Sequence, residues 1–159
     1  MINLNILLVA KLFLLSAAIP QGHGKNLPIQ NDTNGAITKV SYNSTGGRGG
    51  NTVSMEITAN IITYTQGHAG TDKTIRERTS RSLWMNLTRS INIKDFDHVK
   101  SNPGHAMYDG IDVTISVQKG RESHSIVNGN EDAVNYNRIG SFVKILVGQL
   151  DRLAKKINH

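Results

Sequence analysis

The residues best placed by type and spacing to do chemistry form a glycine-rich stretch, Gly46-Gly47-Arg48-Gly49-Gly50. Consecutive glycines can turn several backbone N–H groups toward one point, which creates a binding site for an anion. No Lys-Ser or Lys-Thr pair follows the stretch, so it is not a phosphate-binding P-loop. Glycine beyond the needs of a hairpin turn costs stability through unfolded-state entropy. We therefore predict that these five residues contact a protein or an anionic partner; the alternative is a flexible connection between two strands.

A second group of polar residues, His105, Asp109 and His124, could serve a small hydrolase or lyase. Such a site requires the three side chains within about 4–6 Å of one another in a concave pocket. The chain has no Cys, and it lacks the His-Glu-x-x-His and Gly-x-Ser-x-Gly motifs of zinc peptidases and serine hydrolases. We therefore expect no catalytic residues, no metal site and no cofactor.

Basic residues gather between two expected elements: Lys73, Arg76, Arg78 and Arg81, joined by Arg89. The formal net charge is +6, but single-stranded nucleic acid requires aromatic side chains among the cations, and only Trp84 is near. We interpret the patch as a solvated sheet edge whose charges block unwanted strand pairing. An anionic envelope surface or an acidic protein is the alternative partner; no nucleic-acid partner is expected.

The elements that must position these residues follow from the periodicity of the apolar side chains. Alternating apolar residues predict strands over residues 37–42, 52–58, 61–65, 111–117 and 123–128. Residues 66–72 read as a loop, and residues 74–78 as a basic edge strand or the approach to a helix. Apolar residues at helical spacing predict one helix capped by Thr79 or Ser80, and a last helix from about Arg138. The order βββ-α-ββ-α predicts an α+β domain, an antiparallel β-sheet with two helices packed on one face.

The N-terminal region predicts export to the periplasm or the extracellular space. Apolar residues 6–15 followed by Ser16, Ala17 and Ala18 are typical of a signal peptide that covers residues 1–18. The alternative is a buried or interfacial N-terminal helix, since the run is too short to span a membrane. Residues 19–35 are polar and read as a flexible leader, and residues 36–159 as a single α+β domain with no transmembrane span. A Cys-free exported domain favours a bacterial source.

Several motifs along the chain occur together in one known family. A first strand runs into the Gly-Gly loop of residues 40–50, which contains Ser44-Thr45-Gly46-Gly47. A Leu83-Trp84 pair follows in a helix, then Asp109-Gly110-Ile111-Asp112 at the start of a strand, then a closing amphipathic helix. Over residues 36–155 this pattern resembles the emfourin-like domains, small bacterial proteins associated with thermolysin-like metallopeptidases. The chain departs from that pattern at Arg48 and the glycines after it, where the family has an apolar residue.

This resemblance implies a non-enzymatic exported binding domain, with inhibition of an exported peptidase as one form of that function. A structural, envelope-associated domain without catalytic activity is the alternative. A small hydrolase that uses dispersed His and Asp residues is the third possibility. The oligomeric state is left open by the sequence.

Overall fold

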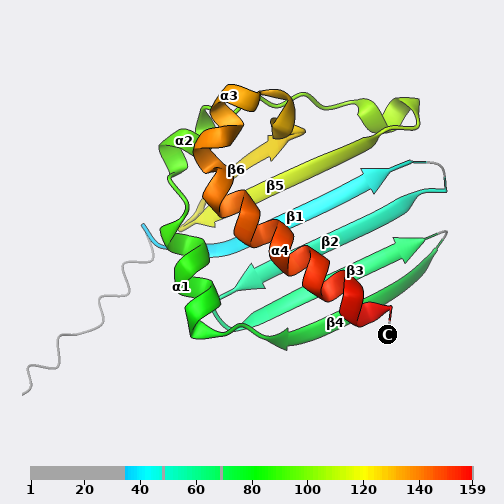
Figure 1. The fold of residues 1–159 in the computed structure, drawn as a ribbon, viewed down its shortest axis with the longest axis horizontal. Coiled ribbons are helices and arrows are strands. Elements are labelled where there is room, and N and C mark those ends of the chain that lie inside the picture. Colours follow the sequence, from blue (N-terminus) through cyan, green and yellow to red (C-terminus); the bar gives the residue numbers. More distant parts are fainter. Residues whose placement is uncertain (1–34, 48, 69, 159) are drawn as a thin grey trace, which may run out of the picture. The chain divides into compact units, whose positions relative to one another are not determined.

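The computed structural model describes residues 35–47, 49–68 and 70–158. The expected signal peptide, the leader up to residue 34, and Arg48 therefore lie outside the described residues. Six strands form one antiparallel sheet in the order β4-β3-β2-β1-β5-β6 (Figure 1). The strands are β1 (Ile37–Gly46), β2 (Asn51–Thr58), β3 (Ile61–His68), β4 (Thr71–Arg78), β5 (Ile111–Lys119) and β6 (Glu122–Val127).

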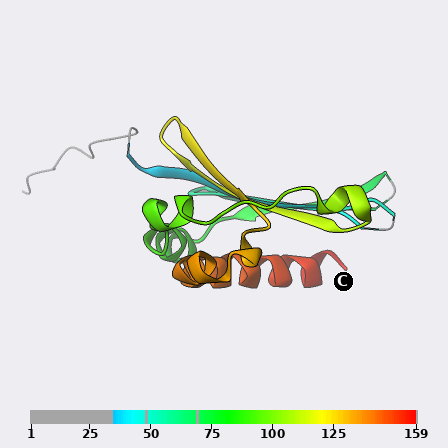
Figure 2. The ribbon, with the colours of Figure 1, turned by 90° about the horizontal axis from the view of Figure 1, so that it is seen from above.

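Four α-helical segments in the described residues pack on a single face of this sheet (Figure 2). They are α1 (Arg81–Arg89), α2 (Ile93–Asp97), α3 (Ala133–Tyr136) and α4 (Gly140–Ile157). The longest, α4, runs diagonally across the strands (Figure 1). Helix α1 begins where the sequence predicts, because the Ser80 Oγ accepts a hydrogen bond from the Leu83 N–H at 3.2 Å.

The hydrophobic core lies between the sheet and α4. Alternate strand residues point into it, and the apolar stripe of α4 closes it from above. Ile115 in mid-strand is 3% exposed, and Leu146 in the middle of α4 is fully buried, as the sequence predicts. Phe96 of α2 meets Phe142 of α4 edge-to-face, with ring centroids 6.1 Å apart. The core also contains Val40, Met55, Ile57, Ile62, Tyr64, Leu87, Val117, Ile126 and Leu153.

The α+β class and the antiparallel sheet are confirmed, but the predicted order βββ-α-ββ-α is wrong. Residues 66–72 are not a loop: Gln66 and Gly67 extend β3, and Thr71 and Asp72 begin β4. Strands β3 and β4 therefore pair up to His68 and Thr71. Gly70, with φ of 85°, provides the left-handed conformation that such a short turn requires. Four strands consequently precede the first helix. The two expected helices are α1 and α4, and the short helices α2 and α3 occur in addition to them.

Candidate functional site

Three segments that are distant in the sequence meet at one end of the sheet. They are the described residues of the β1–β2 loop (46–47 and 49–51), those of the β3–β4 turn (67–68 and 70–72), and the connection into β5 (104–111), at the right of Figure 1. The Gly47 N–H donates a hydrogen bond of 2.8 Å to the Gly110 carbonyl. Across the β2–β3 pair, His68 Nδ1 lies 2.6 Å from Asn51 Oδ1. We call these three segments together the loop end.

The glycine content of the β1–β2 loop follows from its backbone. Gly46, Gly47, Gly49 and Gly50 all have positive φ, between 63° and 123°. At Gly46 a Cβ atom would lie 2.2 Å from the Gly110 carbonyl oxygen, so no other residue fits there. The interpretation of these glycines as more than a turn needs is therefore wrong: each of the four occupies a conformation that disfavours side chains. Their contact with a partner stays a prediction.

The connection into β5 is fixed by one carboxylate. Asp112 Oδ1 accepts hydrogen bonds from the backbone N–H groups of His105 at 3.0 Å and Gly104 at 3.2 Å. The same oxygen accepts from the Asn128 side-chain amide at 2.6 Å. The Asn128 hydrogen bond, with those backbone donors, lowers the pKa of Asp112, since each favours the charged form. The result is an ordered turn and not a mobile tip.

The amide of Asn128 extends this network into the protein. Asn128 is almost completely buried, and its Oδ1 accepts from the Val113 N–H at 2.8 Å. Its Nδ2 also donates to the Asn102 carbonyl at 2.8 Å. The residue adopts a left-handed φ of 48°, which Asn tolerates better than most residues. The connection into β5 is thereby joined to the end of β6.

Large apolar side chains stand in the solvent on this ordered turn. Met107 is 80% exposed, Tyr108 84% and Ile111 52%. Met107 and Tyr108 belong to a 3₁₀ turn, η1 (His105–Tyr108), and Ile111, the first residue of β5, lies opposite Gly46 of β1. The sequence analysis did not select these residues. The available signal was a pair of large apolar residues between two turn-forming dipeptides, Pro103-Gly104 and Asp109-Gly110.

The three residues proposed for a hydrolase have separate surroundings. His105 Nε2 lies 3.1 Å from Glu131 Oε1, while His124 Nδ1 lies 2.8 Å from Asp97 Oδ1. Asp109 ends η1 with a left-handed φ of 59°. None of the three lines the groove of about 670 Å³ between α1, α2 and the start of β1. Within residues 35–158, apart from positions 48 and 69, no three His, Cys, Asp or Glu side chains are grouped closely enough to hold a metal ion.

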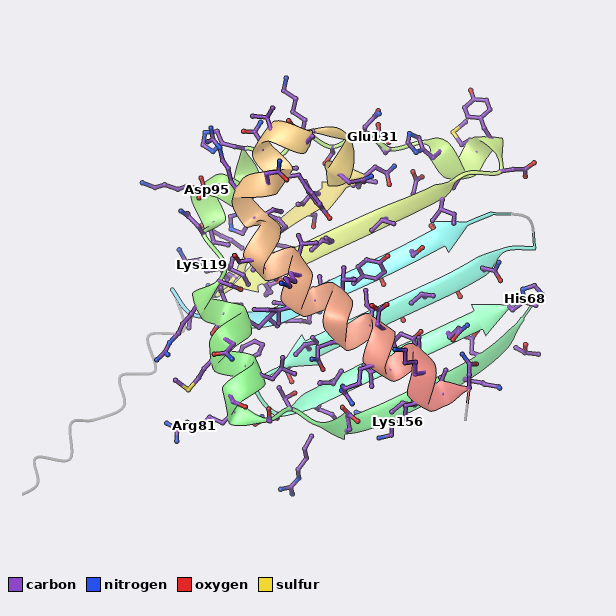
Figure 3. All side chains as sticks on the ribbon, in the orientation of Figure 1. His68, Arg81, Asp95, Lys119, Glu131 and Lys156 are labelled. Carbon is purple, nitrogen blue, oxygen red and sulfur yellow. The ribbon has the colours of Figure 1, made fainter. Side chains whose placement is uncertain are left out.

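Three of the five basic residues lie on the edge strand β4, and the other two, Arg81 and Arg89, lie at the two ends of α1. Lys73, Arg76 and Arg78 are on β4, and Glu77 among them points toward α4. Glu77 forms ion pairs with Arg152 and, at 3.0 Å, with Lys156. The hydrogen bond from Arg152 is the main reason that the pKa of Glu77 is lowered. Figure 3 shows Lys156 at the end of α4 above this strand, and Arg81 where α1 begins.

No protein-family model and no curated protein sequence matches this chain. None of the helices in the described part of the chain combines the length and apolar character that a membrane crossing requires.

Proposed function

We propose that the chain is an exported, non-enzymatic binding domain whose contact surface is the loop end. The observation that carries this proposal is the exposure of Met107 and Tyr108, each at least four-fifths accessible, beside the glycine loop. Exposed apolar side chains that cluster on one surface are typical of protein interaction sites. Binding residues are also commonly carried on loops that a rigid scaffold positions.

The hydrogen bonds that fix the connection into β5 support the same proposal. Asp112 and Asn128 hold the turn before any partner arrives, so binding loses little conformational entropy. The β1–β2 loop adds backbone that a partner can approach closely, because its glycines carry no side chains. Inhibition of an exported peptidase is one form of this function, and it is the form that the emfourin-like pattern implies.

The test removes the apolar side chains and keeps the fold. The full chain would be immobilised and used to capture partners from the native secretome. A captured peptidase would then be released, and its activity would be assayed in the presence and in the absence of the chain. We expect the double variant M107S/Y108S to lose capture, since both side chains project into solvent and stabilise little of the domain. Arg48→Ser tests the sequence-based part of the site without altering a glycine.

The matched control is Val134→Ser, because Val134 is a large apolar residue on α3, 73% exposed and outside the loop end. We expect V134S to capture the same partner as the wild type. Urea unfolding midpoints should be unchanged in M107S/Y108S and V134S. Equal capture by M107S/Y108S and wild type would contradict the proposal, and a structural, envelope-associated domain predicts no specific capture by any variant.

A further inference from the structure

Strand β4 forms an open margin of the sheet (Figure 1). Thr79 lies opposite Asn60 and its N–H donates to the Asn60 carbonyl at 3.1 Å. Hydrogen-bonded and non-hydrogen-bonded residues alternate in an antiparallel pair, so every second residue before Thr79 bonds to β3. The residues between them, which are Asp72, Thr74, Arg76 and Arg78, direct their N–H and C=O groups away from the sheet. Within the described part of the chain, no backbone group of another element bonds to these four residues.

The side chains of this strand are ordered so that the strand complements itself. Two copies laid antiparallel, with Ile75 opposite Ile75, bring Asp72 opposite Arg78 and Lys73 opposite Glu77, which also pairs with Arg152 and Lys156 of its own chain. The two-fold axis repeats both pairs. Opposite charges directly across an antiparallel pair stabilise it, whereas like charges destabilise it. The outward-directed residues Asp72 and Thr74 then meet Arg78 and Arg76, which are also outward-directed, so the ladder of backbone bonds is complete.

The neighbouring registers fit less well. A centre at Arg76 brings Arg76 against its own copy, which is repulsive. A centre at Thr74 keeps one complementary pair, Asp72 opposite Arg76, but it places Lys73 opposite Ile75 and removes the pairing of Lys73 with Glu77. The charge order therefore selects the register centred on Ile75.

We propose that a second copy of this chain pairs with β4 through its own β4, forming one continuous antiparallel sheet across a two-fold axis at Ile75. A two-fold axis perpendicular to the sheet keeps the helices of both copies on the same face. Addition of a strand to an open edge is an established mode of protein association in which backbone bonds give affinity and side chains give specificity. This dimer uses β4, including Asp72 at the margin of the loop end, and leaves the β1–β2 loop, Met107 and Tyr108 free for a partner.

The test exchanges charges across the axis. The full chain would be studied by sedimentation velocity over a range of concentrations. Arg78→Asp places a second carboxylate opposite Asp72, and Asp72→Arg places a second guanidinium opposite Arg78. We expect each variant alone to associate at least about tenfold more weakly than the wild type, because two symmetry-related pairs change at once. A mixture of D72R and R78D should form a heterodimer, because each of its two pairs between positions 72 and 78 then joins an Arg to an Asp. The double variant D72R/R78D should dimerise like the wild type, because its pairs are complementary again.

Two further variants make the outcome decisive. Arg121→Asp alters the net charge by the same amount as Arg78→Asp but lies in the β5–β6 turn, and it should dimerise normally. Thr74→Pro removes one outward N–H and the hydroxyl contact with Thr65 while the backbone bonds to β3 remain, and it should prevent association. A wild-type chain that sediments as a monomer at every concentration overturns the proposal and leaves the basic residues to an acidic partner. Dimers of R78D and D72R as strong as those of the wild type overturn it as well.

Discussion

The two edges of the sheet are protected in different ways. At the end of the β6 edge the chain itself supplies partners: the Val127 N–H donates to Ser101 Oγ at 3.0 Å, and the Val127 carbonyl accepts from the Asn102 N–H at 2.9 Å. At the β4 edge the described residues supply no such backbone partner, and five of the eight strand residues are charged. A covered edge is closed to every other strand, whereas a charged edge excludes only strands with the wrong charges. The comparison teaches that the β6 edge is closed at its end by Ser101 and Asn102, whereas the β4 edge relies on the charges of its side chains.

Helix α4 runs diagonally across the sheet (Figure 1). Loss of its packing should therefore destabilise both edges together and remove the difference between them. Leu146→Ala removes a fully buried side chain, and we expect the free energy of unfolding to fall by about 2–5 kcal/mol. Urea denaturation measures this loss, and amide exchange should accelerate at both edges together. Val147→Ala is the control on the same helix, because Val147 is 41% exposed. A midpoint that L146A leaves unchanged would contradict the assigned core.

Asn128 sharpens the comparison at the covered edge. Asn128→Ala leaves the Val113 N–H and the Asn102 carbonyl without their partner, so we expect a loss of about 2–3 kcal/mol. Asn128→Gly separates the cost of lost hydrogen bonds from that of a left-handed alanine. Asn43→Ala, at an exposed position on β1, should change the free energy of unfolding by less than about 0.5 kcal/mol. A larger acceleration of amide exchange at β4 than at β6, each relative to the wild type, would count against the assignment.

Asp112 predicts a response to acid that is confined to one side of the molecule. Its pKa is lowered by hydrogen bonds in the folded state, so its stabilising contribution is present above the ordinary Asp pKa of about 3.9 and is lost as the pH falls through the lowered value. Amide exchange of Gly104 and His105 should therefore accelerate in acid before that of β4. Asp112→Asn should accelerate this exchange at neutral pH and abolish its acid dependence. Exchange at these two amides that is independent of pH in both proteins, after correction for intrinsic rates, would contradict the role of Asp112.

Glu77 gives the smallest effect, at the open edge. Its pKa is lowered chiefly by the hydrogen bond from Arg152, so the ion pairs stabilise the fold above the ordinary Glu pKa and are lost as the pH falls through the lowered value. Glu77→Gln should cost less than about 1 kcal/mol, and the difference should shrink in high salt. Glu56→Gln removes the more exposed pair with Lys39 and should cost less. A salt-independent loss in E77Q would show that packing, not charge, accounts for the effect.

The sequence was sufficient for elements whose side chains alternate between core and solvent. The strand around Ile115 and the stripe containing Leu146 were identified correctly, because burial imposes a period on the residue types. Strand β4 remained ambiguous because it is largely exposed and its residues show no apolar alternation. The turn at Gly70 hid the ends of β3 and β4. Short helices such as α2 depend on tertiary contacts, here those of Phe96 with Phe142.

The candidate site was predictable only in part. The glycine loop was identified from composition, but its glycines are explained by positive φ and by the close approach of Gly46 to Gly110. Met107 and Tyr108 were not selected, because exposure of an apolar side chain is a property of the fold and not of the residue type. The self-complementary order of charges along β4 can be read from the sequence, but it indicates self-pairing only once β4 is known to be an edge strand.

The diagonal course of α4 sets an order on the folding of the chain. All six strands precede α4 along the sequence, and the apolar face that contains Val40, Ile57 and Val117 is closed by Phe142, Leu146 and Leu153. During synthesis from the N-terminus, the sheet strands emerge before the helix that covers them. A nascent chain that stops short of Gly140 can cover this face only with α1, α2 and α3, so the domain can complete its core only after α4 has been made.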